Sequence, residues 1–286
     1  NFNESPHIFI SGLPRSGTTS ILNFIYSSNK FGSLKYLNMP FILSPNLSKI
    51  INQKNIIKKE RLHSDGIKYD LNSPEAFDEF FFKNDKEFIK SELLNYISLV
   101  LRSEKKSIYL SKNNLNYKRI NLISSILPKS IFLIPIREPL QHAYSLLNQH
   151  INFINLQKND DFVRKYMSYL SHNEFGLDHC SWYKPIYYKN FENINYWLEQ
   201  WLFFYKQIFE RYKAQKNCIF VTYEKLTDHR YLRDILKKIN LNEYDNLNLN
   251  FFKNLNKSKI KIDFDKEIYE NAINLYNDFK QIDYNF

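Results

Sequence analysis

The segment from Ile8 to Ser20 constrains the fold of this chain more than any other stretch of its sequence. A short apolar strand runs into a loop that holds two of the chain's five glycines, Gly12 and Gly17, and then into a helix with an apolar period. Such a loop leaves main-chain N–H groups unpaired at a helix N-terminus, where the helix dipole also favours an anion. The segment therefore predicts an α/β fold with a phosphate site after its first strand.

The spacing Gly12-x4-Gly17-Thr18-Thr19 matches a Walker A loop except at one position. Thr18 stands where a nucleotide triphosphatase carries its lysine, and the nearest cation in the loop is Arg15, three residues earlier. The loop therefore predicts phosphate binding without transfer of a γ-phosphate.

Two motifs of the chain resemble those of sulfotransferases that use 3′-phosphoadenosine 5′-phosphosulfate (PAPS). The loop Pro14-Arg15-Ser16-Gly17-Thr18-Thr19 resembles their 5′-phosphosulfate-binding loop. An apolar strand over 131–136 then ends in Arg137-Glu138-Pro139, and Ser145 follows eight residues after the arginine. In that family, an arginine and a serine at this spacing hold the 3′-phosphate. A guanidinium offers a rigid fork of donors to a phosphate, and the proline suits the first turn of the next helix.

The resemblance implies an enzyme that moves a sulfuryl group from PAPS to an acceptor hydroxyl or amine and releases 3′-phosphoadenosine 5′-phosphate (PAP). The loop is expected to hold the 5′ side of the donor, and Arg137 with Ser145 is expected to hold its 3′-phosphate. The residues implied to bind the donor are Pro14, Arg15, Ser16, Gly17, Thr18, Thr19, Ser20, Arg137 and Ser145.

Lys112 follows a short apolar strand and resembles the lysine that many sulfotransferases place near the bridging oxygen of PAPS. A positive charge there would stabilise the leaving phosphate as the S–O bond breaks, so Lys112 and Arg15 are the expected catalytic cations. Asn113 and Asn114 depart from the residues common after that lysine. A solvated surface lysine is the alternative interpretation.

The acceptor must lose a proton to a base, and the loop-rich stretch between the two motifs carries the candidates. His63 is favoured as the base, with Asp65 orienting it or acting as the base itself, and Glu75 is a third option. Titratable residues in a long loop often mark function, although a surface loop without chemistry is the alternative for each of them. Ser73 and Pro74 predict a helix start just before Glu75.

A second titratable cluster spans His172–His179. Sulfuryl transfer from PAPS needs no metal and no compact ligand spacing stands out, so no metal site is predicted. The cluster is expected to line the acceptor pocket or to cap helices. Trp182 and Tyr183, just after it, could stack on a sugar.

Strands alternate with helices along the rest of the chain, which predicts a mostly parallel sheet flanked by helices, with sites at the carboxyl ends of the strands. We expect one sulfotransferase domain over residues 1–286, with loop-rich, acceptor-facing insertions at about 30–72 and 150–192. The expected strands are 108–110, 131–136 and 217–224, and the expected helices are about 88–101, 116–127, 194–213 and 231–239.

The formal net charge of +10 fits either a solvated lysine- and asparagine-rich surface or a field that steers anions such as PAPS. The sequence carries no nucleic-acid-binding signature, so no such partner is expected. No apolar run approaches the roughly 18 residues that span a bilayer, and no signal-peptide pattern opens the chain. A cytoplasmic location is therefore favoured, whereas the oligomeric state and a leader or anchor before Asn1 stay open.

Two other functions remain open from the sequence. A P-loop kinase or other nucleotide-binding enzyme needs a cation beside the terminal phosphate, and Thr18 in the lysine position argues against it. In a non-catalytic basic protein that binds glycans, the binding affinity would decrease steeply as the salt concentration rises. The preferred interpretation is a PAPS-dependent sulfotransferase, and the aromatic content of 17% favours a carbohydrate acceptor over a phenol.

Overall fold

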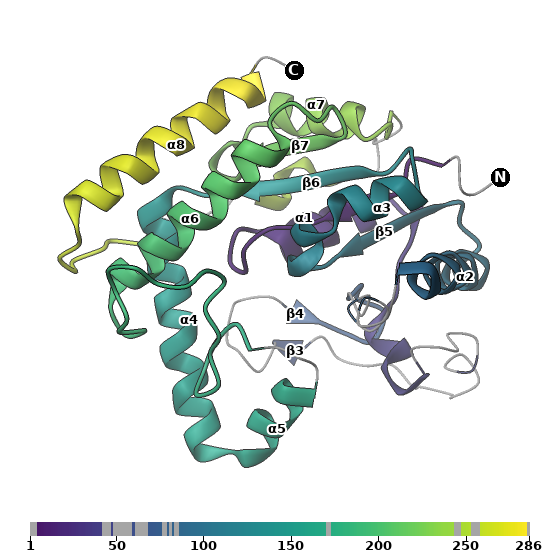
Figure 1. Ribbon diagram of the computed structural model, residues 1–286. Helices are drawn as coiled ribbons and strands as arrows, with labels where there is room; N and C mark the ends of the chain where they lie inside the picture. The colour runs from purple at the N-terminus through teal and green to yellow at the C-terminus, as the bar shows by residue number, and fades with distance from the viewer. Residues whose placement is uncertain are drawn as a thin grey trace.

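The centre of the molecule is a five-stranded sheet in the order β2-β5-β1-β6-β7, with every neighbouring pair parallel (Figure 1). The computed structural model describes residues 5–41, 47, 59–60, 68–75, 79, 82, 86–169, 173–242, 247–252 and 258–284. The parallel sheet with its flanking helices confirms the predicted α/β class. The strands are β1 (Ile8–Ile10), β2 (Phe31–Gly32), β5 (Ile108–Lys112), β6 (Ile131–Ile136) and β7 (Cys218–Thr222).

The strands are short apolar runs because helices cover the sheet on both faces. Phe9 and Phe132 point to one face and belong to the larger hydrophobic core. Their neighbours Ile8, Ile10 and Leu133 point to the other face and belong to a second core. Successive side chains on a strand alternate between faces, so each strand contributes to both cores.

The helices divide between these two cores. The larger core takes side chains from α2, α3, α4, α5, α6 and α8, and the second core takes them from α1 and α7. Another helix, α5 (Asp161–Tyr169), follows α4 at the end of that helix farthest from the sheet (Figure 1). The bounds are α1 (Thr18–Tyr26), α2 (Lys86–Glu104), α3 (Ile120–Ile126), α4 (Pro139–Asn159), α6 (Ile194–Tyr212), α7 (His229–Lys238) and α8 (Lys266–Tyr284).

Shorter elements connect these layers. A two-stranded antiparallel sheet pairs β3 with β4, outside the main sheet. The 3-10 helices follow strands or link helices, and two of them, η5 and η6, begin just after β5 and β7. The bounds are β3 (Lys59–Glu60), β4 (Lys68–Tyr69), η2 (Tyr36–Phe41), η5 (Asn114–Lys118), η6 (Tyr223–Thr227) and η7 (Leu249–Phe252).

The structure corrects two expectations about the chain's organisation. The stretch at 150–192 is not loop-rich at its start, because α4 continues to Asn159 and α5 follows it. No helix starts at Ser73, whose hydroxyl instead donates to the Asp70 carboxylate at 3.0 Å and accepts from the Asp70 N–H. The Glu75 N–H donates to the Leu34 carbonyl at 2.9 Å, so this segment is extended.

None of the helices in the described ranges combines the length and the apolar character that a bilayer-spanning helix requires.

Candidate donor and catalytic site

Three neighbouring strands carry sequence-predicted site residues at their carboxyl ends, and Tyr223, which the sequence did not predict for the site, follows a fourth. The order β5-β1-β6-β7 places Lys112, the loop after β1, Arg137 and Tyr223 along one edge of the sheet. The connection after β1 leads to β2 on one side of that strand, whereas the connection after β6 leads to β7 on the opposite side of the sheet. A crevice forms at such a switch point, and open α/β sheets bind their ligands there.

The loop after β1 has the backbone of an anion-binding turn. Gly17 is the N-cap of α1 with φ +98°, and no side chain caps the helix. The first N–H groups of α1 therefore lack a protein acceptor from such a cap. A Cβ atom at Gly17 would lie 2.6 Å from the ring of Tyr223, so only glycine fits beneath that ring.

Ser16 closes the loop on itself. Its N–H and its hydroxyl both donate to the Leu13 carbonyl, at 3.3 and 2.7 Å, and its side chain is fully buried. Ser16 therefore holds the shape of the loop, because both of its donors are used within the loop.

The two predicted phosphate motifs meet at Arg15. The Arg15 Nε donates to the Ser145 hydroxyl at 3.2 Å, and the Arg137 guanidinium donates to the Arg15 carbonyl at 3.2 Å. The Arg137 guanidinium also lies 5.1 Å from the ring centre of Tyr223, within cation–π range. Two guanidiniums and a helix N-terminus thus converge, which favours an anion with more than one charge.

His142 supports this loop from α4, although it is not among the site residues predicted from the sequence. Its Nε2 lies 2.8 Å from the Pro14 carbonyl, and its side chain is fully buried. Burial lowers the pKa of His142 to about 3, and the guanidiniums of Arg137 and Arg15 act in the same direction. The imidazole is therefore neutral near pH 7, and its Nε2–H donates to the carbonyl.

Lys112, the last residue of β5, forms an ion pair with Glu75. Its Nζ lies 4.0 Å from the Glu75 Oε1, and both side chains are 14% exposed. The Tyr36 hydroxyl donates to the Glu75 Oε2 at 2.7 Å. Next to this pair, the Thr18 hydroxyl contacts the Asn114 amide oxygen at 3.5 Å, which connects the end of β5 to the loop after β1.

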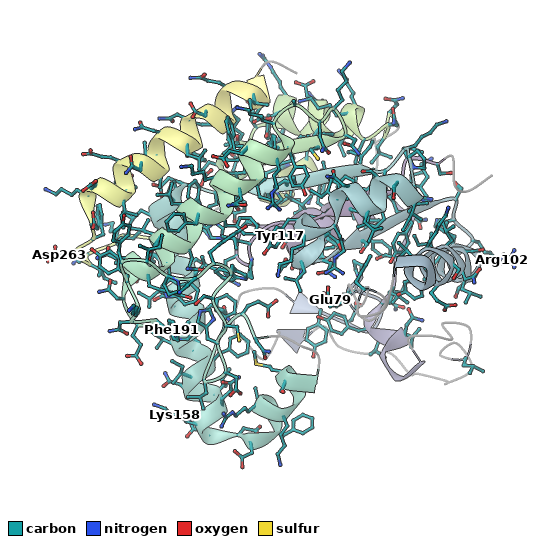
Figure 2. The ribbon with its side chains drawn as sticks, in the orientation of Figure 1. Glu79, Arg102, Tyr117, Lys158, Phe191 and Asp263 are labelled. Carbon is teal, nitrogen blue, oxygen red and sulfur yellow. The ribbon has the colours of Figure 1, made fainter. Side chains whose placement is uncertain are left out.

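Asn113, directly after Lys112, forms hydrogen bonds with neighbouring segments of the chain. Asn113 accepts from the Leu115 N–H at the start of η5 and donates to the Glu79 carboxylate at 3.0 Å. Arg119 donates at 2.6 Å to the same carboxylate, that of Glu79, which Figure 2 labels. Its guanidinium covers the ring of Phe82 at 4.0 Å.

The favoured base candidates, His63 and Asp65, lie outside the described residues. Of the three candidates, Glu75 is the one whose surroundings are described.

The described part of the second titratable cluster contacts helices α5 and α6. Asp178 pairs with Arg164 of α5 at 2.6 Å on the surface. His179 is buried, its Nε2 lies 2.7 Å from the Tyr196 hydroxyl, and burial lowers the pKa of His179 to about 4. His172 lies outside the described residues. Asp178 therefore lies on the surface and His179 packs within the fold, and a place for this cluster in the acceptor pocket remains a prediction.

Trp182 and Tyr183 are partly buried and pack against the larger core. The Trp182 ring contacts Trp197 at 5.8 Å between ring centres, within a group of aromatic rings around α6. The main chain of Tyr183 exchanges two hydrogen bonds with the Gln200 amide. These contacts hold the segment before α6 in place.

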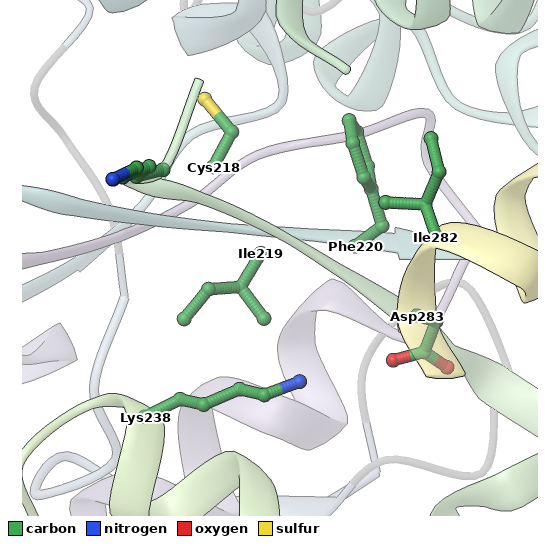
Figure 3. Close-up of a pocket in the computed structure, with 7 residues that line it drawn as sticks. Cys218, Ile219, Phe220, Lys238, Ile282 and Asp283 are labelled. Carbon is green, nitrogen blue, oxygen red and sulfur yellow. The ribbon is translucent and has the colours of Figure 1, made fainter. Parts of the chain in front are cut away.

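No group of three or more His, Cys, Asp or Glu side chains is arranged to hold a metal ion within the part of the chain that the structure describes. A pocket of about 220 Å³ lies along β7, and none of the predicted donor-site residues lines it (Figure 3). Its lining residues are Lys216, Cys218, Ile219, Phe220, Lys238, Ile282 and Asp283.

These features define a parallel α/β protein whose candidate site lies at the switch point of its sheet. Residues 6–245 match the model of the sulfotransferase family, and the chain therefore belongs to that family of enzymes. The prediction of a sulfotransferase is confirmed, and the kinase and the non-catalytic glycan-binding alternatives are set aside. No curated protein sequence matches the chain significantly.

Solved structures of sulfotransferases are similar to this fold. STF1 from Mycobacterium tuberculosis H37Rv aligns with 11% identity and a TM-score of 0.50, over 97% of this chain and 77% of its own. STF9 from Mycobacterium avium aligns with 12% identity and a TM-score of 0.46, over 96% and 68%. The sulfotransferase domain of the Synechococcus PCC 7002 olefin synthase aligns with 13% identity and a TM-score of 0.45, over 97% and 95%.

Proposed function

We propose that this sulfotransferase takes its sulfuryl group from PAPS and releases PAP. The observation that carries the proposal is the contact between the two motifs. The Arg15 guanidinium donates to the Ser145 hydroxyl, and the Arg15 main-chain carbonyl accepts from the Arg137 guanidinium. PAPS carries anionic groups on both the 5′ and the 3′ side of one nucleoside. A site with a helix N-terminus on one side and a guanidinium with a hydroxyl on the other matches that pair of charges.

Each part of the site has a proposed role toward the donor. The loop from Pro14 to Ser20 binds the 5′ side through the amides at the start of α1, with the hydroxyls of Thr18 and Thr19 beside them. Arg137 and Ser145 bind the 3′-phosphate. Arg15 adds positive charge between these two positions and contributes to catalysis.

The reaction is a direct displacement at sulfur. The acceptor oxygen or nitrogen attacks the sulfur, the bond from sulfur to the phosphate oxygen breaks, and its electron pair stays on PAP. Lys112 stabilises the charge that develops on that oxygen. The acceptor's proton passes to a base, for which His63 and Asp65 remain predictions. Glu75 is supported by its ion pair with Lys112 and its hydrogen bond from Tyr36.

The acceptor that we propose is a hydroxyl or amine on a carbohydrate. Tyr36 and Tyr69 lie with their ring centres 4.6 Å apart, and Tyr36 bonds to the Glu75 carboxylate. An aromatic surface beside a carboxylate suits a ligand with apolar faces and many hydroxyls. A small-molecule acceptor of another class is the alternative.

The donor proposal predicts transfer of labelled sulfur from PAPS to an acceptor in the presence of EDTA. Incubation of the protein with labelled PAPS and a panel of oligosaccharides, amino sugars and phenols should yield labelled carbohydrate and an equal amount of PAP. Arg137→Ala should abolish transfer, since it removes the guanidinium proposed for the 3′-phosphate, whereas Lys237→Ala, an exposed lysine on α7, should not change it. Transfer to a phenol alone would contradict the acceptor, and a requirement for ATP and Mg²⁺ would contradict the donor.

The base proposal predicts which carboxylate or imidazole is needed for the chemical step. Loss of a general base lowers kcat by about 10²- to 10⁴-fold, with little effect on donor binding. Glu75→Gln, His63→Gln and Asp65→Asn should therefore be compared by kcat and by PAP affinity. The variant that loses kcat and keeps its PAP affinity identifies the base, and an unchanged kcat in Glu75→Gln would contradict a role for Glu75.

A further inference from the structure

Helix α8 presents three polar side chains on one face toward the strand ends of the donor site. Tyr269, Tyr276 and Asp283 are seven residues apart, which is close to two helical turns, so they lie in one row. The helix packs against α6 through Ala272 and Phe279, both buried in the larger core (Figure 1). The family match ends at residue 245, so the whole helix lies beyond the matched region.

The first two members of the row bond to carboxylates next to donor-site residues. The Tyr269 hydroxyl donates to the Glu138 Oε1 at 3.0 Å, and Glu138 directly follows Arg137. The Tyr276 hydroxyl donates to the Glu224 Oε2 at 2.6 Å, and Glu224 directly follows Tyr223. Each tyrosine thus bonds to the glutamate that directly follows a site residue in the sequence.

The two glutamates are also connected to each other, through the main chain of Glu138 and the carboxylate of Glu224. The Glu138 main-chain N–H donates to the Glu224 Oε1 at 2.9 Å. That N–H belongs to the peptide group that follows Arg137, so Glu224 fixes the backbone from which the guanidinium extends. Glu138 in turn caps α4 by accepting from the Gln141 N–H at 2.7 Å. The carboxyl ends of β6 and β7 are therefore held together by this pair of glutamates.

The third member of the row attaches the end of α8 to β7. The Asp283 Oδ2 accepts from the hydroxyls of Thr222 and Tyr231, at 2.8 and 2.7 Å, and from the Lys225 ammonium at 3.2 Å. Figure 3 shows Asp283 next to Ile282 and beside the strand that carries Phe220. This anchor sets the position of the helix along the sheet.

We propose that Tyr269 and Tyr276 are positioning residues of the donor site, which act through Glu138 and Glu224 to hold Arg137 and Tyr223 in place for a phosphate. The proposal rests on the proposed function, because the ligand it concerns is PAP or PAPS. A guanidinium that is already oriented loses less side-chain freedom on binding, which improves affinity without a new contact.

The chemistry of the two tyrosines fits a permanent support. Burial, together with the neighbouring carboxylate, raises the pKa of Tyr269 to about 12, and the same two causes raise the pKa of Tyr276. Both hydroxyls therefore keep their protons near pH 7 and continue to donate. The bonds are of the stronger, charge-assisted kind, since each acceptor is a carboxylate.

The test is the affinity of the full chain for PAP in Tyr269→Phe, in Tyr276→Phe and in the double variant. Each single change removes one hydroxyl and leaves the ring in place, and the half-buried Tyr269 is the safer of the two for folding. We expect the Kd for PAP to rise about fivefold or more in each variant. The KM for PAPS should rise in parallel, while kcat at saturating PAPS stays near the wild-type value.

Tyr212→Phe is the matched control. Its buried hydroxyl donates to the neutral Tyr117 carbonyl at 2.9 Å, between α6 and η5, so the variant loses a tyrosine hydrogen bond that involves neither Glu138 nor Glu224. Its Kd for PAP should stay within about twofold of the wild type. A lower melting temperature in the α8 variants with an unchanged Kd would overturn the positioning role. A wild-type protein that does not bind PAP would instead overturn the proposed function.

Discussion

At the scale of single residues, the loop after β1 contains a residue, Arg15, whose backbone conformation is unfavourable for any residue other than glycine. Arg15 has φ +67°, a left-handed conformation that costs most L-residues free energy. The Pro14 carbonyl just before it accepts from the neutral His142, and the Arg15 carbonyl accepts from Arg137. Bonds on both sides of the residue thus hold the conformation, as is common at functional sites.

The buried His142 predicts a loss of stability in acid. Because its folded pKa of about 3 lies below the usual 6.5, the unfolded chain binds a proton first as the pH falls. The contribution of His142 to the free energy of unfolding is complete above about pH 6.5. Below that pH it decreases by about 1.4 kcal/mol per pH unit, down to the folded pKa. His142→Gln keeps an N–H donor without this titration. Urea titrations at pH 6 and pH 4.5 measure how much the free energy of unfolding decreases between the two. The decrease in the wild type should exceed that in His142→Gln by about 2 kcal/mol. Equal falls would contradict the assignment.

Gly17 predicts a second effect at the residue scale. An alanine there would have an unfavourable φ and a Cβ atom 2.6 Å from the Tyr223 ring, so the ring or the loop must move. Gly17→Ala should weaken PAP binding by about tenfold or more. Ser27→Ala, at the other end of α1, is the control and should bind PAP as the wild type does. Normal binding by Gly17→Ala would show that the tight turn is not needed.

At the scale of elements, the segment before α6 is fixed by one buried carboxylate. Glu199 of α6 is 1% exposed and accepts from the main-chain N–H groups of three consecutive residues, at 2.8, 2.9 and 3.1 Å. These residues are Ile186, Tyr187 and Tyr188. A carboxylate can accept all three bonds, whereas an amide side chain places an N–H₂ group against at least one N–H.

Glu199→Gln should therefore lower the free energy of unfolding by about 2 to 3 kcal/mol, because a buried donor loses its acceptor. Urea unfolding at pH 7 measures this difference. Glu192→Gln changes an exposed glutamate of the same segment and should stay within about 0.5 kcal/mol of the wild type. A Glu199→Gln variant as stable as that control would contradict the role of the three bonds.

The elements that the sequence predicts well are those with a strong apolar period. The strand 131–136 and the helix starting at Ile194 agree with β6 and α6 because buried residues dominate both. The helix α8 was not predicted, although Ala272, Tyr276 and Phe279 follow a helical spacing, because polar residues separate them. Ser73 resembled a helix cap because a serine before a proline can cap a helix or close a turn, and only the Asp70 contact decides between them.

At the scale of the whole molecule, the strand order turns separate motifs into one site. Gly17 and Arg137 were recognisable from the sequence because each stands after a strand with a characteristic spacing. Contacts between distant segments were not, so the sequence did not predict that Arg15 would bond to Ser145 or Lys112 to Glu75. Those pairs depend on β5 and β6 lying on either side of β1, which is a property of the topology.

The most direct measurement of the central claim is the affinity for PAP compared with ADP, which lacks the 3′-phosphate, by calorimetry in EDTA. A site with separate groups for the two phosphates should bind PAP about a hundredfold more tightly than ADP, since a charge-assisted contact contributes about 1.5 to 3 kcal/mol and the 3′-phosphate makes more than one. In Arg137→Ala that preference should largely disappear. Equal affinities for PAP and ADP in the wild-type protein would contradict the account.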